Sequence, residues 1–299
     1  LISLKRLPGC LARLTADHNG ARGATMLELR SIFHPTDFSD ASEEAFVHAL
    51  RIALTVKCGL TLLHVAAPVD ERDWMTFPYV RETLARWGLM SEYEPQATVA
   101  EKLGVNIAKI ELAPQSTIGA ILQHLDSNPA DLIVLGTQGR EGVARWLNGS
   151  VAEKIARYAK APTLFVPNGA RGFVDPLRGE IHLKRLLIPV DNTPKPAAAV
   201  GTIMRFAHML TGPAVEERLF HVGRDVPQLQ HHAKPHLPVP VATVSGDPVD
   251  GIINEAMAWQ PDLIAMPTAG HHGFLDALRG STTERVIRQA PCPVLAVPA

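Results

Sequence analysis

The chain has 299 residues, enough for two domains of about 100–150 residues each. Its 29 Lys and Arg residues nearly balance its 30 Asp and Glu residues, so no global field would attract nucleic acid or an anionic membrane. The longest apolar runs fall well short of the roughly 20 residues that a membrane-spanning helix needs. The three cysteines, Cys10, Cys58 and Cys292, form no Cys-x-x-Cys pair, which argues against structural zinc and disulfides and predicts a cytoplasmic protein.

Residues 1–28 are predicted to be an N-terminal extension outside the first domain. Their short apolar stretch is broken at Pro8-Gly9, so they lack the apolar core of a signal peptide. The ordered pattern begins only near Leu29, and Met26 would suit a start codon. We therefore expect this extension to be disordered or not to belong to the native protein.

From Leu29 onwards, short Val, Ile and Leu runs alternate with longer stretches of helical period. This alternation, with nearly continuous apolar strands, predicts a doubly wound α/β fold: a parallel sheet with helices on both faces. In chain order we expect strands near 31–36, 60–66, 105–112, 131–136 and 163–167, and helices over 40–57, 78–103, 116–127 and 149–159.

The second half of the chain repeats the first. Residues 131–167 align with 262–298 without a gap, and upstream "IFHPTDFS" corresponds to "LIPVDNT" and "LLHV" to "LFHV". The segment 169–182, rich in Gly, Pro and charge, is interpreted as a linker. We therefore predict two tandem domains, 29–168 and 183–299.

The stretch "GTQGREGVARWLNGS" (136–150) follows the apolar run "DLIVL". Ligands of open parallel sheets bind at the carboxyl ends of the strands, where Gly136 and Gly139, without Cβ atoms, would permit a close approach. Gly149-Ser150 would open a helix whose free N–H groups and dipole favour a phosphate. The competing interpretation is ordinary turn glycines and an ordinary helix cap. The spacing is neither that of a Walker loop nor that of a dinucleotide-binding loop.

Asp37 directly follows the first predicted strand, at the same sheet edge as the glycines. Its carboxylate could accept hydrogen bonds from a ribose hydroxyl or a base amine, or it could cap the helix that follows. A carboxylate and a phosphate-binding loop at one edge together favour a nucleotide site.

"PTDFS", "LLHV" and Gly-x2-Gly-x9-Gly-Ser followed by "VAEKIARYAKAPTLFVP" together resemble the universal stress protein family. Both copies resemble it over nearly their whole length. The resemblance implies a Rossmann-like, adenine nucleotide alpha hydrolase-like fold with five parallel strands in each copy, and binding of ATP, AMP or ADP. It implies adenosine contacts from Asp37 and Val65, phosphate contacts from Gly136, Gly139, Gly149 and Ser150, and pocket walls from Pro35, Thr36 and Val151.

The second copy departs from this pattern at Pro267, which stands where the first copy has Gly136. Proline fixes φ and has no N–H to donate to a phosphate. We therefore expect one competent site in the first copy and a weakened or vacant one in the second. The residues that would form the weaker second site are Asp191, Val222, Gly270, Gly280 and Ser281.

The sequence shows no paired carboxylates with a positioned base, no nucleophile elbow and no Lys within the glycine motif. We therefore predict no enzyme activity beyond slow ATP hydrolysis. Arg140 would either reach the γ-phosphate or remain a solvated surface residue. No metal site is expected from protein residues alone; magnesium or manganese would arrive with the phosphates.

Universal stress proteins are generally dimers, and the resemblance implies pairing through the last strand of each fold. The segments "PTLFVP" (162–167) and "PVLAVP" (293–298) are apolar edge strands that would otherwise be exposed. We expect them to pair within the chain as a pseudo-twofold pair, with a further homodimer left open.

The leading function is a nucleotide-dependent stress-response regulator with an unidentified protein partner. The alternatives are an interaction scaffold with vestigial pockets, and an adenylating enzyme, which would need a substrate domain and a cationic cluster that the sequence does not show.

Overall fold

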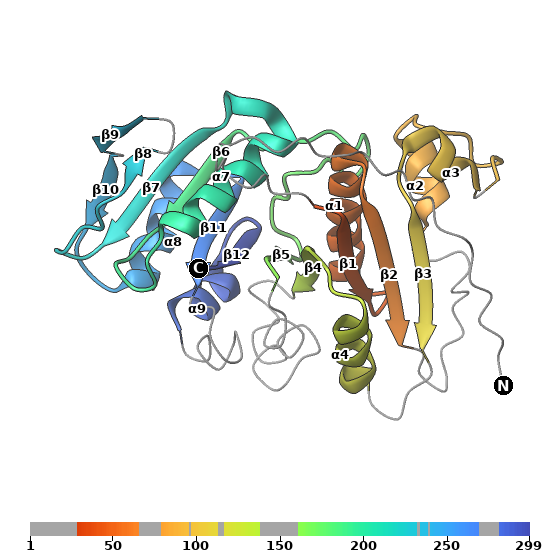
Figure 1. The fold of residues 1–299 in the computed structure, drawn as a ribbon, viewed down its shortest axis with the longest axis horizontal. Helices are drawn as coiled ribbons and strands as arrows, with labels where there is room; N and C mark the ends of the chain where they lie inside the picture. The colour runs from red at the N-terminus through yellow and green to blue at the C-terminus, as the bar shows by residue number, and fades with distance from the viewer. Residues whose placement is uncertain are drawn as a thin grey trace, which may run out of the picture.

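Two α/β units share one ten-stranded sheet in the computed structural model of the chain (Figure 1). The expected extension 1–28 and the expected helix 149–159 lie outside the described residues. The structure describes residues 29–65, 79–95, 97–112, 117–137, 161–231, 234–238, 240–268 and 281–299.

The first unit has five parallel strands in the order β3-β2-β1-β4-β5. Each strand lies where the apolar runs predict it. The elements are β1 (Ser31–Thr36), α1 (Asp40–Val56), β2 (Gly59–Val65), α2 (Val80–Arg86), α3 (Ala97–Leu103), β3 (Ile107–Leu112), α4 (Thr117–Ser127), β4 (Leu132–Thr137) and β5 (Thr163–Pro167).

The single helix predicted over 78–103 is wrong, because this stretch forms two short helices, α2 and α3. Gly88 has φ +70°, the left-handed conformation that commonly ends a helix. Pro95 lies just before α3, and proline disfavours helical backbone at the residue that precedes it. The apolar period continues across both residues, which is why the pattern alone suggested one helix.

The second unit repeats the arrangement, with five parallel strands in the order β10-β7-β6-β11-β12. Its elements are β6 (Arg185–Pro189), α7 (Ala197–Thr211), the 3-10 turn η2 (Gly212–Ala214), β7 (Glu216–Val222), β10 (Val241–Val244), α8 (Pro248–Trp259), β11 (Leu263–Thr268), α9 (Thr282–Gln289) and β12 (Val294–Pro298), with β8 (Gln230–His231) and β9 (Lys234–Pro238) forming a separate two-stranded sheet.

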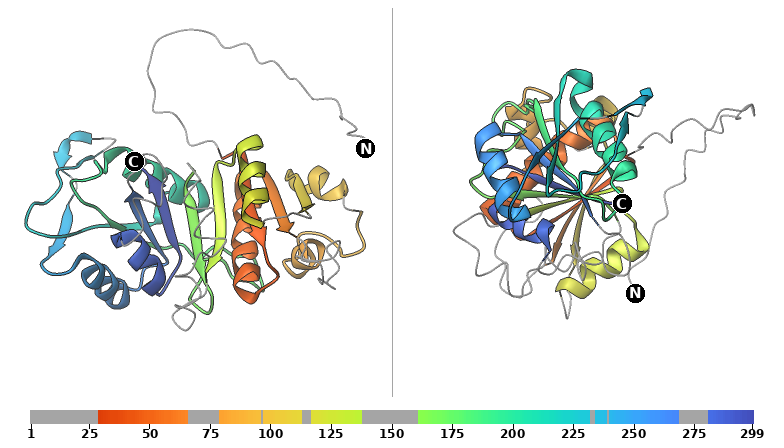
Figure 2. Two further views of the ribbon diagram at one scale, coloured as in Figure 1. Left: turned by 90° about the horizontal axis from the view of Figure 1, so that it is seen from below. Right: turned by 90° about the vertical axis from the view of Figure 1, so that its left-hand side faces the viewer.

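The two units join through an antiparallel pairing of β5 with β12, as the sequence predicts. Phe165 lies opposite Val294 and Thr163 lies opposite Ala296, and all four residues are buried. The sheet twists along its length, with helices on both faces (Figure 2). Because the joining strands run in opposite directions, the carboxyl ends of the strands in the two units lie at opposite edges of the sheet.

The segment between β5 and β6 packs onto the first unit instead of running free. The Phe173 N–H donates to Nε2 of His48 on α1 over 3.2 Å, and the two rings meet edge to face at 4.7 Å. Nε1 of Trp87 donates to the carbonyl of Pro176 over 3.1 Å. Phe173 is fully buried, so the segment adds an apolar residue to the core of the first unit.

The same segment also contacts the second unit. The Arg171 guanidinium bonds the buried Asp262 carboxylate over 2.6 Å. Asp262 further accepts the N–H groups of Lys184 and Arg185, and so holds the start of β6 against the start of β11. The segment therefore ties both units together along one edge of the sheet.

We predict that acidification from pH 7 to pH 4 weakens the fold through its buried histidines. Burial lowers the pKa of His34 and of His48 from 6.5 to about 4. The unfolded chain therefore binds more protons in this window, and the unfolding free energy falls as the pH falls, by up to about 3 kcal/mol for each histidine.

Urea unfolding at several pH values would measure this loss. His48→Gln keeps an acceptor for the Phe173 N–H but cannot titrate, so its stability should depend less steeply on pH. The wild-type chain, measured over the same pH values, is the reference. An equal pH dependence in wild type and His48→Gln would contradict the assignment.

Candidate functional site

The strand-end residues expected to bind a ligand converge at the carboxyl edge of the first unit. Pro35 and Thr36 end β1, Asp37 follows it, Val65 ends β2 and Gly136 lies on β4. The strand β1 is flanked by β2 and β4, so these residues come from three neighbouring strands. The other residues expected in this site, Gly139, Arg140, Gly149, Ser150 and Val151, lie outside the described residues.

Asp37 takes part in the start of α1. Its Oδ1 accepts the N–H of Ser39 over 3.1 Å and the hydroxyl of Ser39 over 2.6 Å. Ser39 is the N-cap residue of α1 and accepts the N–H of Ser42. The N-cap residue of α1 is therefore Ser39 and not Asp37, and Asp37 supports the cap through its two hydrogen bonds with Ser39.

Gly136 is required by the packing of α1. A Cβ atom at this position would lie 2.3 Å from the Ala41 carbonyl oxygen and 3.0 Å from the Ser42 nitrogen. Gly136 is a strand residue, and the residues with left-handed backbone do not include it. The sequence predicts the close approach of a ligand at Gly136, and that contact stays a prediction; the backbone that approaches Gly136 in the structure is the first turn of α1.

Thr137 is a residue that the sequence reasoning missed. Its side chain is 4% exposed at the end of β4, and among the described residues its hydroxyl has no hydrogen-bond partner. The equivalent Thr268 hydroxyl donates to the Val297 carbonyl over 3.2 Å. Comparing the two aligned copies points to the position, but only the structure shows that one hydroxyl is paired and the other is not.

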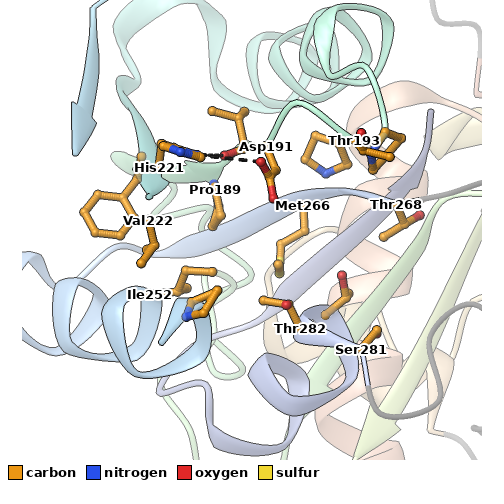
Figure 3. Close-up of a pocket in the computed structure, with 16 residues that line it drawn as sticks. Pro189, Asp191, Thr193, His221, Val222, Ile252, Met266, Thr268, Ser281 and Thr282 are labelled. Carbon is orange, nitrogen blue, oxygen red and sulfur yellow. Dashed lines mark hydrogen bonds and ion pairs between the residues drawn. The ribbon is translucent and has the colours of Figure 1, made fainter. Parts of the chain in front are cut away.

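A cavity of about 230 Å³ lies at the carboxyl edge of the second unit (Figure 3). It brings together three of the residues expected there: Asp191 after β6, Val222 at the end of β7 and Ser281 at the start of α9. Gly270 and Gly280 lie outside the described residues. Apolar side chains of β7, β11 and α8 form much of its wall: Phe220, Met266 and Ile252.

The second unit opens this cavity by starting its first helix later. After β6 the chain passes through the cis Thr193-Pro194 bond, and α7 begins only after Pro196. Thr193 and Pro194 line the cavity, as does Pro267 of β11. In the first unit the first turn of α1 packs against Gly136 of β4. In the second unit Pro267 stands in the place of Gly136, and the first helix begins later in the chain.

His221 forms part of the cavity wall. Its ring is buried, and its Nδ1 lies 3.0 Å from the Val190 carbonyl and 4.0 Å from Oδ1 of Asp191. A carbonyl only accepts, so Nδ1 carries a proton and donates it to Val190. Within the described part of the chain Nε2 has no hydrogen-bond partner.

The described residues contain no group of three or more His, Cys, Asp and Glu side chains that could hold a metal ion. Among the helices that the structure describes, none is long and apolar enough to cross a membrane.

The model of the universal stress protein family matches residues 28–167 and 214–298. The chain belongs to this family. One matched region covers the first unit and the other covers the second unit from β7 onwards, leaving out β6 and α7, and the sheet shows that this universal stress protein carries the fold twice.

Among curated relatives, a universal stress protein of Methanocaldococcus jannaschii is 34% identical over an alignment of 146 residues, and the alignment covers 46% of this chain and 81% of that protein. A universal stress protein of Mycobacterium bovis is 26% identical over 270 residues, covering 79% of this chain and 86% of its own. The second relative therefore spans both units.

Two solved structures share the whole fold. A universal stress protein from Archaeoglobus fulgidus aligns with a TM-score of 0.56 at 19% identity, over 91% of this chain and 97% of its own. A functionally unknown protein from Pseudomonas aeruginosa aligns with a TM-score of 0.59 at 16% identity, over 91% and 94%. At these identities the likeness concerns the fold alone.

We predict that Gly136→Ala destabilises the ligand-free protein by about 1–3 kcal/mol, because the new methyl group would overlap the α1 backbone. Gly59→Ala is a matched strand control, since a Cβ there meets its nearest atom at 3.5 Å. Urea unfolding would compare the two variants. An unchanged unfolding free energy in Gly136→Ala would mean that the glycine does not serve the packing of α1.

We predict that removing the two equivalent threonine hydroxyls changes the unfolding free energy differently. Thr268→Val loses the hydrogen bond to Val297 and should lower the unfolding free energy by about 1 kcal/mol. Thr137→Val removes a buried hydroxyl without a partner among the described residues and should leave stability unchanged or higher. Equal losses in both variants, measured by thermal unfolding, would refute this difference.

Proposed function

We propose that this universal stress protein is a nucleotide-dependent stress-response regulator that binds ATP, or another adenine nucleotide, at the carboxyl edge of its first unit. The adenosine would contact Asp37 and Val65, and the phosphates would bind the glycine motif that follows β4. The binding state of this site would then alter the conformation or the partner choice of the protein in the cytoplasm.

The observation that supports this proposal is the cavity of the second unit. It forms at the edge of the sheet where the strand order of an open α/β fold places its ligands. Asp191, Val222 and Ser281 line it, although they lie far apart in the sequence. They are the counterparts of Asp37, Val65 and Ser150, so the same topology favours a site at the corresponding edge of the first unit.

The first unit retains the full glycine pattern that the second unit interrupts with Pro267. Backbone N–H groups at a helix start are well suited to phosphate, and proline supplies none. A magnesium or manganese ion would be held mainly by the phosphates and water. We therefore expect ATP to bind in the first unit and not to be hydrolysed efficiently there.

Isothermal titration of the full chain with ATP and magnesium tests the proposal. We expect one ATP for each chain, with binding lost in Gly149→Val because a branched side chain in the predicted phosphate-binding motif would block the phosphates. Gly280→Val, the same change in the second unit, should leave ATP binding intact. Two equal ATP sites, or no binding together with no nucleotide released on denaturation, would contradict the proposal.

A further inference from the structure

The connecting segment between β5 and β6, drawn in green in Figure 1, is fastened to the side of α1. The Gly169 N–H donates to the Glu44 carboxylate over 3.3 Å. Gly172 lies directly against the His48 ring, where an added Cβ atom would be 2.5 Å from Cε1. Nδ1 of the same ring lies 2.8 Å from the Glu44 carbonyl, so the ring is held in place. The position of the segment therefore depends on the position of α1.

The segment reaches the second unit through Arg171, which lies between its two contacts with α1. The Arg171 guanidinium bonds the Asp262 carboxylate, whose side chain is 2% exposed. Asp262 also holds the start of β6 through the N–H groups of Lys184 and Arg185. A shift of α1 would therefore pull on the contact that fixes the first strand of the second unit. Conversely, the loss of that contact would free the segment from one of its two anchors.

The start of α1 lies in the site proposed for adenosine. Oδ1 of Asp37 already accepts two hydrogen bonds from Ser39, the N-cap residue of α1. A ribose hydroxyl or base amine that donates to this oxygen would compete with Ser39, so the free and bound chains would hold the helix start differently. Because α1 continues unbroken from its first residue to Val56, a change at its start would reach Glu44, just over one turn away.

We propose that the connecting segment, residues 168–184, is an autoinhibitory strap. Docked on α1, it holds the helix start in the position in which Ser39 engages Asp37, and so favours the nucleotide-free state of the first unit. The inference rests on the proposed function for the ligand, but it goes further: it gives the second unit, through Arg171 and Asp262, control over nucleotide affinity in the first. Because such coupling is reciprocal, releasing the strap at either anchor should strengthen ATP binding.

Isothermal titration of the full chain with ATP and magnesium tests the strap. Arg171→Gln removes the ion pair to the second unit, and Gly172→Ala places a methyl group against the His48 ring on the first. We expect each variant to bind ATP about fivefold or more tightly than wild type. Arg285→Gln is the matched control, because it removes another ion pair of the second unit, with Asp247, and should leave ATP affinity unchanged.

Hydrogen exchange of the same chains without nucleotide measures the docking itself. The amides of Gly169, Phe173 and α1 should exchange faster in Arg171→Gln than in wild type, while those of β2 should not. Thermal unfolding checks that each variant remains folded.

ATP binding that is equal in wild type and in both strap variants would overturn the inference and still support the proposed function. Unchanged exchange in Arg171→Gln would also overturn the inference, because the segment would then stay docked without its second anchor. If no chain binds ATP, the proposed function fails, and the exchange rates alone then decide whether the strap couples the two units.

Discussion

The antiparallel pairing of β5 with β12 is the contact on which the arrangement of the molecule depends. Each unit ends in an apolar strand whose open edge would otherwise invite aggregation. Because one chain carries both strands, each edge covers the other and a single ten-stranded sheet results. The two joining strands are buried as a result, with Phe165 and Val294 fully buried.

The direction of this pairing also sets where the sites and the connection between the units lie. The carboxyl ends of the two sets of strands point to opposite edges, so two ligand sites would face away from each other. The end of β5 and the start of β6 come to the same edge. The connecting segment therefore runs along one side, where Phe173 packs on His48 and Arg171 reaches Asp262.

The two units show how one residue and one helix start depend on each other. The first turn of α1 lies so close to β4 that only glycine fits at position 136. The second unit has Pro267 at the equivalent position, and there the helix begins beyond a proline-rich loop whose residues line a cavity. The same topology thus gives a tightly packed helix start in one unit and an open pocket in the other.

Most of the fold could be predicted from the sequence. The spacing of apolar residues and the residue types of the strands are local patterns, and the internal repeat is a similarity between two segments of the same chain. They located the strands of the first unit, the repeat and the two apolar edge strands, since burial of both sheet faces demands continuous apolar runs. They did not locate the break between α2 and α3, where the apolar period continues across Gly88 and Pro95 and backbone conformation decides.

The site was predictable only in outline. Strand ends such as Asp191 and Val222 follow from topology, which brings carboxyl ends together. The sequence by itself determined the family, the two tandem units and the edge of the sheet at which ligands would lie. Only the tertiary structure decided that Gly136 serves α1, that among the described residues Thr268 is paired while Thr137 is not, and that a cavity opens at the carboxyl edge of the second unit. The reason is that each of these depends on distances between segments far apart in the chain, which no local pattern encodes.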